Sequence, residues 1–164
     1  IIAKELGMDV VYQENILNSA PMHDIGKVGI PDSILLKPGR LDKNEFEIMK
    51  SHTVIGYNIL KDSESNTLKD GAVIALSHHE NYDGSGYPNG LKGDAIPLSG
   101  RITKIADVFD ALINKRIYKP AYTLEETLRI MKDEMKPGAA FDPDCFGAFL
   151  KGLDEILEVR RDVR

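Results

Sequence analysis

The spacing of apolar residues constrains the fold of this chain more than any other feature, because they recur three and four positions apart through most of it. This period is typical of helices that bury one face. Helix-start signals agree with it: Asp42 and Thr123 each open a capping box, and Asp142 stands before Pro143. No stretch of useful length alternates apolar and polar residues, so the sequence predicts an all-α fold. A helix is expected over residues 9–24, in which Pro21 should kink the helix or shift its last turn. Further helices are expected over residues 42–60, 68–79, 102–113, 123–135 and 142–153.

Residues 80–100 interrupt this helical pattern with five Gly and two Pro in 21 positions. Such a composition does not sustain a regular helix, and a loop of this length is usually either functional or disordered. The segment between Gly29 and Asp42 holds two prolines and is expected to be a connector.

Composition narrows the class of protein. A length of 164 residues fits one domain with its own core, so we expect residues 1–164 to form a single domain. The chain starts with Ile rather than Met, and we expect it to be truncated at its N-terminus. The single Cys excludes a disulfide framework and a Cys-based zinc module, and it suits a reducing compartment such as the cytoplasm. Acidic residues outnumber Lys and Arg by 26 to 21, which argues against DNA as a partner, and no apolar run approaches the ~18 residues of a membrane span.

The four histidines are the most informative polar residues. One is followed by Asp24, two are adjacent to each other, and His52 lies on the apolar stripe of its helix. Imidazole and carboxylate groups that converge from several helix ends form a nitrogen and oxygen site, which iron, manganese, zinc or nickel can occupy. Two divalent ions can clamp a phosphate and lower the pKa of a bound water molecule.

The same residues also have plainer interpretations. A single His on an apolar helix face is more often a satisfied core residue, so His52 alone is a weak signal. Asp107 follows an apolar pair, and a buried carboxylate favours a nearby cation, but it could equally cap or brace a neighbouring helix. His78 and His79 could be a C-terminal pair favoured by the helix dipole. Spacing alone therefore favours a metal site only slightly and does not name a reaction.

Three segments together carry a resemblance to a known family. They read HDIGKVGIPDSILLKPGRL from residue 23, KSHTVIG from residue 50, and HHENYDGSGYPNGLKGDAIPLSGRITKIADVFDAL from residue 78. They strongly resemble the HD-GYP domain, a branch of the HD phosphohydrolase superfamily whose members are cyclic di-GMP phosphodiesterases, and the likeness runs from about Leu6 to Phe146. The resemblance implies a helical bundle of five core helices plus additional C-terminal helices, with a long Gly-rich GYP loop. It also implies two or three divalent metal ions, most often iron or manganese.

The resemblance assigns expected roles to individual residues. Asp24 would bridge metals and take part in catalysis, and Lys27 would lie close to the phosphate as a second catalytic residue. The expected metal ligands are His23, Asp24, His52, His78, His79 and Asp107. The expected substrate contacts are Gly86, Tyr87, Arg116 and Lys119.

The chain departs from the family pattern in three places. The family's RPYK segment reads Arg116-Ile117-Tyr118-Lys119 here, and Pro21 replaces a helix former near the HD pair. The family also takes at least one further ligand from a helix that would precede Ile1. The number of metals is therefore left open at this point.

The expected function is metal-dependent hydrolysis of cyclic di-GMP to pGpG in bacterial second-messenger signalling, with GMP as a further product left open. Two alternatives remain: an HD phosphohydrolase that acts on another nucleotide or cyclic dinucleotide, and a non-catalytic module that binds cyclic di-GMP or docks a partner. The resemblance also leads us to expect an upstream sensory or receiver domain and other signalling proteins as partners. A homodimer is left open, and the location is expected to be cytoplasmic, as part of a larger sensor protein.

Overall fold

The computed structural model describes residues 1–114 and 121–162 and is helical almost throughout. Within these ranges there is no β-strand, apart from one isolated bridge between Pro137 and Phe141. The α-helices are α1 (Ile2–Glu5), α2 (Val10–Ser19), α3 (Asp32–Leu35), α4 (Lys43–Lys50), α5 (His52–Leu60), α6 (Asn66–Ser77), α7 (Leu98–Ile113), α8 (Leu124–Arg129), α9 (Pro143–Lys151) and α10 (Leu153–Asp162). Shorter helical turns cover Ala20–Met22, Ile25–Gly29 and Gly93–Ala95, and a π-helix covers Ile130–Met135. The all-α prediction is confirmed.

The helix-start signals read from the sequence act as caps in the structure. The Asp9 carboxylate accepts a hydrogen bond from the Tyr12 backbone N–H at 2.8 Å. Capping boxes with both hydrogen bonds formed open α4 at Asp42 and α8 at Thr123. Asp142 caps α9 with Pro143 in its first turn. Each cap satisfies backbone N–H groups that would otherwise lack an intrahelical partner.

Several predicted boundaries were wrong. The α-helix from Asp9 ends at Ser19 rather than near Asp24. Its last turn shifts to a 3₁₀ turn, as expected at Pro21, which has no N–H to continue the α-helical ladder. The expected helix over residues 42–60 breaks at Ser51, whose N–H and hydroxyl both donate to the Ile48 carbonyl. The connector contains the short helix α3. The last expected helix ends at Lys151 as α9, and a further helix, α10, starts at Leu153.

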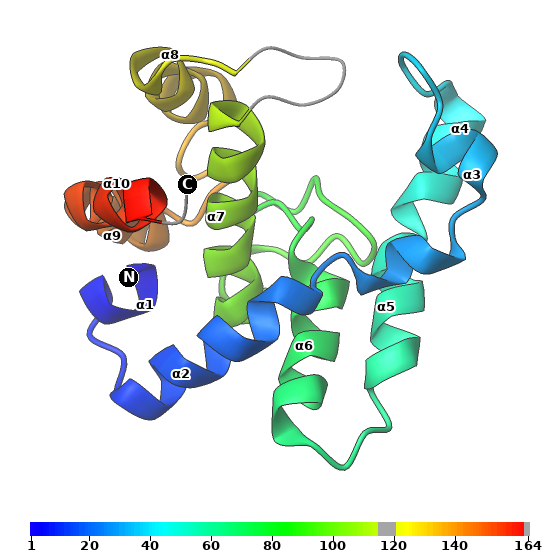
Figure 1. The fold of residues 1–164 in the computed structure, drawn as a ribbon, viewed down its shortest axis with the longest axis horizontal. Coiled ribbons are helices and arrows are strands. Elements are labelled where there is room, and N and C mark those ends of the chain that lie inside the picture. Colours follow the sequence, from blue (N-terminus) through cyan, green and yellow to red (C-terminus); the bar gives the residue numbers. More distant parts are fainter. Residues whose placement is uncertain (115–120, 163–164) are drawn as a thin grey trace.

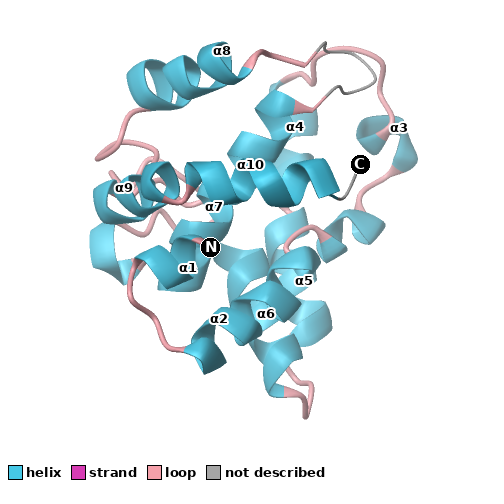
Figure 2. Cartoon of the chain, turned by 60° about the vertical axis from the view of Figure 1, so that its left-hand side comes forward, coloured by secondary structure: helices cyan, strands magenta, loops and turns pink. Residues whose placement is uncertain are grey.

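The main core lies around α7, which stands between the C-terminal helices and α6 (Figure 1). Its buried residues come chiefly from α7 and α9; Phe109 and Phe149, one from each, meet edge to face at 5.1 Å. A second view shows α1 and α10 on the same side of the molecule (Figure 2). None of the described helices combines the length and apolar character needed to cross a membrane. The core thus packs α7 beside the end of α6, where the histidine pair lies.

Two glycines allow the close approaches that place the polar residues. A Cβ on Gly26 would lie 1.8 Å from the His52 carbonyl oxygen and 2.4 Å from the Gly56 nitrogen, so the turn Ile25–Gly29 packs backbone to backbone on α5. A Cβ on Gly100 would lie 2.2 Å from the Ser77 hydroxyl, so α7 passes equally close to the end of α6. These contacts bring the turn after Asp24, the start of α5 and the end of α6 to one place.

Candidate metal centre

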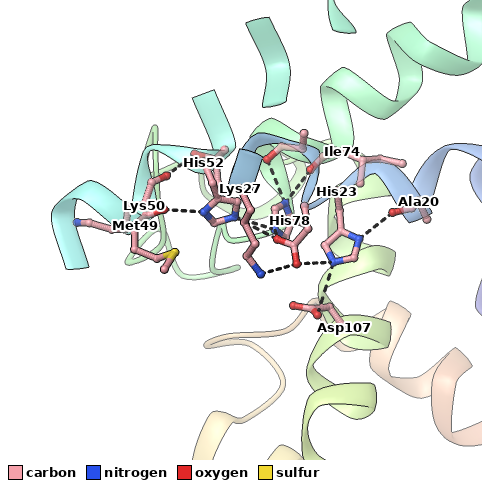
Figure 3. Close-up of polar contacts among 12 residues, drawn as sticks. Ala20, His23, Lys27, Met49, Lys50, His52, Ile74, His78 and Asp107 are labelled. Atoms are coloured by element: carbon pink, nitrogen blue, oxygen red, sulfur yellow. Dashed lines mark hydrogen bonds and ion pairs between the residues drawn. The ribbon is translucent and has the colours of Figure 1, made fainter. Parts of the chain in front are cut away.

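Four of the predicted ligands lie close together, at the first or last residues of three helical elements. Asp24 precedes the turn Ile25–Gly29, His52 is the first residue of α5, and His78 caps α6 with His79 directly after it. One ligand atom from each of these four residues lies within 4.8 Å of the others. Figure 3 shows His52, His78 and His23 pointing toward one another from different elements. Groups far apart in the sequence therefore form one compact polar site.

Backbone hydrogen bonds fix which nitrogen of two rings faces the site. Nδ1 of His52 lies 2.7 Å from the Met49 carbonyl oxygen, and Nδ1 of His78 lies 3.0 Å from the Ala75 carbonyl oxygen. Each Nδ1 therefore carries the proton and donates, because a carbonyl oxygen can only accept. The two Nε2 atoms, 3.5 Å apart, then face each other as lone pairs. Such an arrangement is unfavourable unless a cation lies between the two atoms, and this second hydrogen bond to backbone is typical of metal-bound histidines.

A buried carboxylate oxygen of Asp24 also indicates a cation at this place. Asp24 Oδ1 lies 3.5 Å from Nε2 of His52 and 3.9 Å from Nε2 of His78. Among the described residues this oxygen is buried and accepts no hydrogen bond. A buried carboxylate oxygen without a donor is costly, and a divalent cation would satisfy it together with both lone pairs. The donor set of imidazole nitrogen and carboxylate oxygen therefore fits a divalent transition metal ion.

Burial sets the protonation states that such a site needs. It lowers the pKa of His52, that of His78 to about 3 and that of His79 to about 2. All three imidazoles are therefore neutral near pH 7, the form that binds metals. Burial opposes ionisation of Asp24, but hydrogen bonds from His23 and Lys27 outweigh it and hold the Asp24 pKa far below its usual value.

His23 and Asp107 lie at the margin of the four-residue group. Nε2 of His23 is 3.4 Å from Asp24 Oδ2 and 3.7 Å from Asp107 Oδ1, while its Nδ1 donates to the Ala20 carbonyl oxygen at 2.9 Å. The hydrogen bond to Asp24 raises the His23 pKa. Asp107 reaches the site from α7 (Figure 3). The structure therefore gathers all six predicted ligands in one region, with four of them in the tight group.

The predicted catalytic lysine is close to the same group. Lys27 Nζ lies 2.5 Å from Asp24 Oδ2, and its side chain is 39% exposed. The ammonium can therefore reach an anion that binds beside Asp24 from the solvent side.

The long loop is anchored by a residue to which the sequence analysis gave no role. Glu80 is 1% exposed, and its carboxylate accepts hydrogen bonds from the backbone N–H groups of Asn89 at 2.8 Å and Leu91 at 3.0 Å. These bonds tie the far side of the loop to the residue after the histidine pair. The sequence offered a signal, because Glu80 directly follows His78-His79 and an acidic residue there can serve the backbone of a Gly-rich loop.

The loop places its two predicted substrate contacts differently. The Tyr87 ring stacks on the His79 ring, with centroids 4.8 Å apart and planes at 19°. Gly86 instead approaches its own chain, because a Cβ there would lie 2.1 Å from the Asn81 nitrogen. The requirement for glycine at position 86 is therefore explained by loop packing. Arg116 and Lys119 lie outside the described residues.

A buried lysine near the site was also not predicted from the sequence. Lys104 is 8% exposed and lies one helical turn before Asp107 on α7. Burial lowers the Lys104 pKa to about 8, although the negative charges of Asp107, Glu80 and Asp83 act to raise it. The i to i+3 spacing from Asp107 was the available signal, since residues so spaced share a helix face.

Fold and site together define an all-helical protein with a histidine and aspartate centre suited to divalent cations. The model of the HD domain family matches residues 1–145, and the chain belongs to this family.

A cyclic di-GMP phosphodiesterase of Thermotoga maritima is 53% identical over 160 residues, which cover 98% of this chain and 43% of that protein. The cyclic di-GMP phosphodiesterase response regulator RpfG of Xanthomonas campestris is 46% identical over 97% of this chain and 42% of its own length. A 3'3'-cGAMP-specific phosphodiesterase 2 of Vibrio cholerae is 48% identical over 97% of this chain and 30% of its own. The chain thus spans less than half the length of each of these relatives.

Proposed function

We propose that this chain is the catalytic domain of a metal-dependent phosphodiesterase that hydrolyses cyclic di-GMP to pGpG, with GMP as a further product. The observation that carries the proposal is the gathering of His52, His78 and His79 around Asp24, one of whose carboxylate oxygens is buried and accepts no hydrogen bond. Relatives named as cyclic di-GMP phosphodiesterases, at 46–53% identity over nearly the whole chain, support the choice of substrate.

The chain's own residues have distinct tasks in this proposal. His23, Asp24, His52, His78, His79 and Asp107 hold two or three divalent ions, with iron or manganese as the expected metals. Such ions, when bound, supply Lewis-acid charge and a water molecule of lowered pKa. Lys27 neutralises negative charge on a phosphate oxygen beside Asp24, where its ammonium already lies. Tyr87 covers His79 and excludes water from that side of the site.

The loop and the undescribed segment complete the proposed substrate site. Gly86 lets the loop fold tightly enough to present Tyr87 beside His79. Arg116 and Lys119 are proposed to grip phosphate oxygens, a role for which Arg offers a planar fork and Lys a point charge. We further propose that residues 1–164 act as one HD-GYP domain of a longer cytoplasmic signalling protein, with an upstream sensory or receiver domain and with a homodimer as its assembly.

The test is an activity assay with a matched pair of variants. Protein loaded anaerobically with Fe²⁺, or with Mn²⁺, is incubated with cyclic di-GMP, and nucleotides are separated by chromatography. Asp24→Asn keeps the size of the side chain but removes the charge, and should lower turnover at least 100-fold. Asp154→Asn, at an exposed position of α10, makes the same chemical change away from the site and should leave turnover unchanged. Absence of pGpG and GMP from the wild-type reaction would refute the proposal.

A second candidate substrate has its own support. Three relatives at 38–48% identity are named 3'3'-cGAMP-specific phosphodiesterases. The same assay with 3'3'-cGAMP separates the two cases, because the preferred substrate has the higher kcat/KM. Binding of cyclic di-GMP without turnover of either nucleotide would instead favour the non-catalytic module.

A further inference from the structure

A row of aromatic rings leads from the metal centre to the surface of α4. The Tyr87 ring stacks on His79 and also meets the Phe46 ring edge to face, with centroids 6.2 Å apart and planes at 81°. Phe46 belongs to α4 and is 47% exposed. The row therefore starts at a ring within the four-residue group and ends at an aromatic ring open to solvent.

A lysine on the same helix holds the outer two rings together. Lys50 lies one turn after Phe46, and its Nζ is 5.6 Å from the centroids of both the Phe46 and Tyr87 rings. An ammonium over an aromatic ring is attracted by the ring's negative face. Lys50 also pairs with Glu47 at 2.8 Å, which limits its movement. The Phe46 ring therefore has a cation and a second aromatic ring as neighbours beside the loop.

We propose that the open ring of Phe46 is a stacking platform for a purine base of the substrate. The inference rests on the proposed function, because it takes the phosphate of a nucleotide to lie at the metal centre. In a nucleotide, one ribose separates the phosphate from the base, so a base reaches outward from the bound phosphate. Tyr87 covers the first step of that path, and Phe46 offers the next aromatic surface. Stacking on an aromatic side chain is a general way to hold a base, because every base has a π-face.

An isolated exposed apolar residue would need no such explanation. Phe46 differs because its ring is held by two partners, one of which contacts a histidine of the centre. The chain supplies a close comparison in Tyr57 of α5, where Lys61 lies one turn later with Nζ 5.7 Å from the ring. Within the described residues Tyr57 makes no ring contact with the site. The two lysine and aromatic pairs thus share their geometry, and only one adjoins the centre.

The chain contains no Trp, so a single substitution creates a unique fluorescent reporter. Phe46→Trp and the control Tyr57→Trp are titrated with a phosphorothioate analogue of cyclic di-GMP that resists hydrolysis, and with ribose 5-phosphate, which lacks a base. We expect the analogue to quench the fluorescence of Phe46→Trp and not that of Tyr57→Trp, and ribose 5-phosphate to quench neither. Stacking brings the indole and guanine rings into contact, which is the cause of the quenching.

Kinetics with cyclic di-GMP supply the second measurement. Phe46→Ala should raise KM about 5- to 100-fold, with a smaller effect on kcat, because the lost contact serves binding. Phe46→Leu, which keeps apolar bulk without a π-face, should resemble Phe46→Ala and not wild type. Unquenched Phe46→Trp together with a wild-type KM in Phe46→Ala would overturn the platform while leaving the proposed function intact. Quenching of Phe46→Trp in a protein that does not hydrolyse cyclic di-GMP would support the platform and refute the proposed function.

Discussion

Gly26 offers the most stringent test of how the fold builds the metal centre. Replacement by Ala places a Cβ 1.8 Å from the His52 carbonyl oxygen, whereas such contacts essentially never fall below 3.0 Å. The turn Ile25–Gly29 and α5 must therefore separate by about 1.2 Å. The obstructing atoms belong to the backbone of α5 and cannot swing away. Overpacking of this kind costs about 3 kcal/mol of unfolding free energy, at the upper end of its usual range.

The same displacement should weaken metal binding. Asp24 lies two residues before Gly26, so movement of the turn carries Asp24 away from His52 and His78, which it faces at 3.5 and 3.9 Å. Urea unfolding gives the free energy of unfolding of the metal-free protein, and titration with Mn²⁺ gives the affinity. We expect Gly26→Ala to lose about 3 kcal/mol and at least tenfold in affinity.

Gly147 provides the matched control. It lies exposed within α9, and a Cβ there would meet no atom within 4 Å. Gly147→Ala should therefore stabilise the protein by about 0.5–1 kcal/mol through the higher helix propensity of Ala. If Gly26→Ala unfolded within 0.5 kcal/mol of wild type and bound Mn²⁺ equally well, the reasoning from close backbone contact would be refuted.

Three further predictions concern the loop, the histidines and a cap. Glu80→Gln replaces a carboxylate that accepts two backbone N–H bonds, and should raise KM for cyclic di-GMP about tenfold while circular dichroism stays unchanged; an unchanged KM would contradict the anchoring role. Below pH 6.5 the unfolded state takes up protons that the buried His78 and His79 do not bind in the folded protein. In urea unfolding, the stability of the metal-free protein should therefore fall between pH 6.5 and 5, by up to about 1.4 kcal/mol per pH unit for each histidine. The raised pKa of His23 acts in the opposite sense, adding stability below pH 6.5 that is lost as the pH rises through its folded pKa. The variant His23→Asn removes this opposing contribution, so flat stability between pH 6.5 and 5 in that variant would contradict the burial argument. Asp42→Ala should cost about 1 kcal/mol in the same unfolding assay, with Mn²⁺ affinity unchanged, because its capping box opens α4 away from the ligands.

The sequence predicted the helices better than their ends. Period and capping residues identify helices because they depend on nearby residues, and the caps at Asp9, Asp42, Thr123 and Asp142 all form. The break at Ser51 depends instead on one serine sharing the Ile48 carbonyl, which no periodic pattern reveals. Boundaries therefore required the structure, while the fold class did not.

For the site, too, the sequence predicted which residues take part but not how they are arranged. The motifs named the residues that gather at the centre, but not their states: the facing lone pairs of His52 and His78 follow from backbone carbonyls that only the folded chain brings near. Glu80 was missed because its partners, Asn89 and Leu91, lie across a loop whose path the sequence does not specify. The approach of Gly86 to Asn81 is equally a property of that path.

The central claim is that Asp24 and the histidines form a metal centre, and a direct measurement is metal binding by the metal-free protein. Mn²⁺ is titrated while the melting temperature is followed, and bound metal is counted after dialysis. The account predicts at least one tightly bound ion per chain, with about 2.7 kcal/mol of added stability at 100 times Kd. Asp24→Asn should lose this ion and its stabilisation, whereas Asp154→Asn should keep both. Equal metal content and equal stabilisation in wild type and Asp24→Asn would contradict the account.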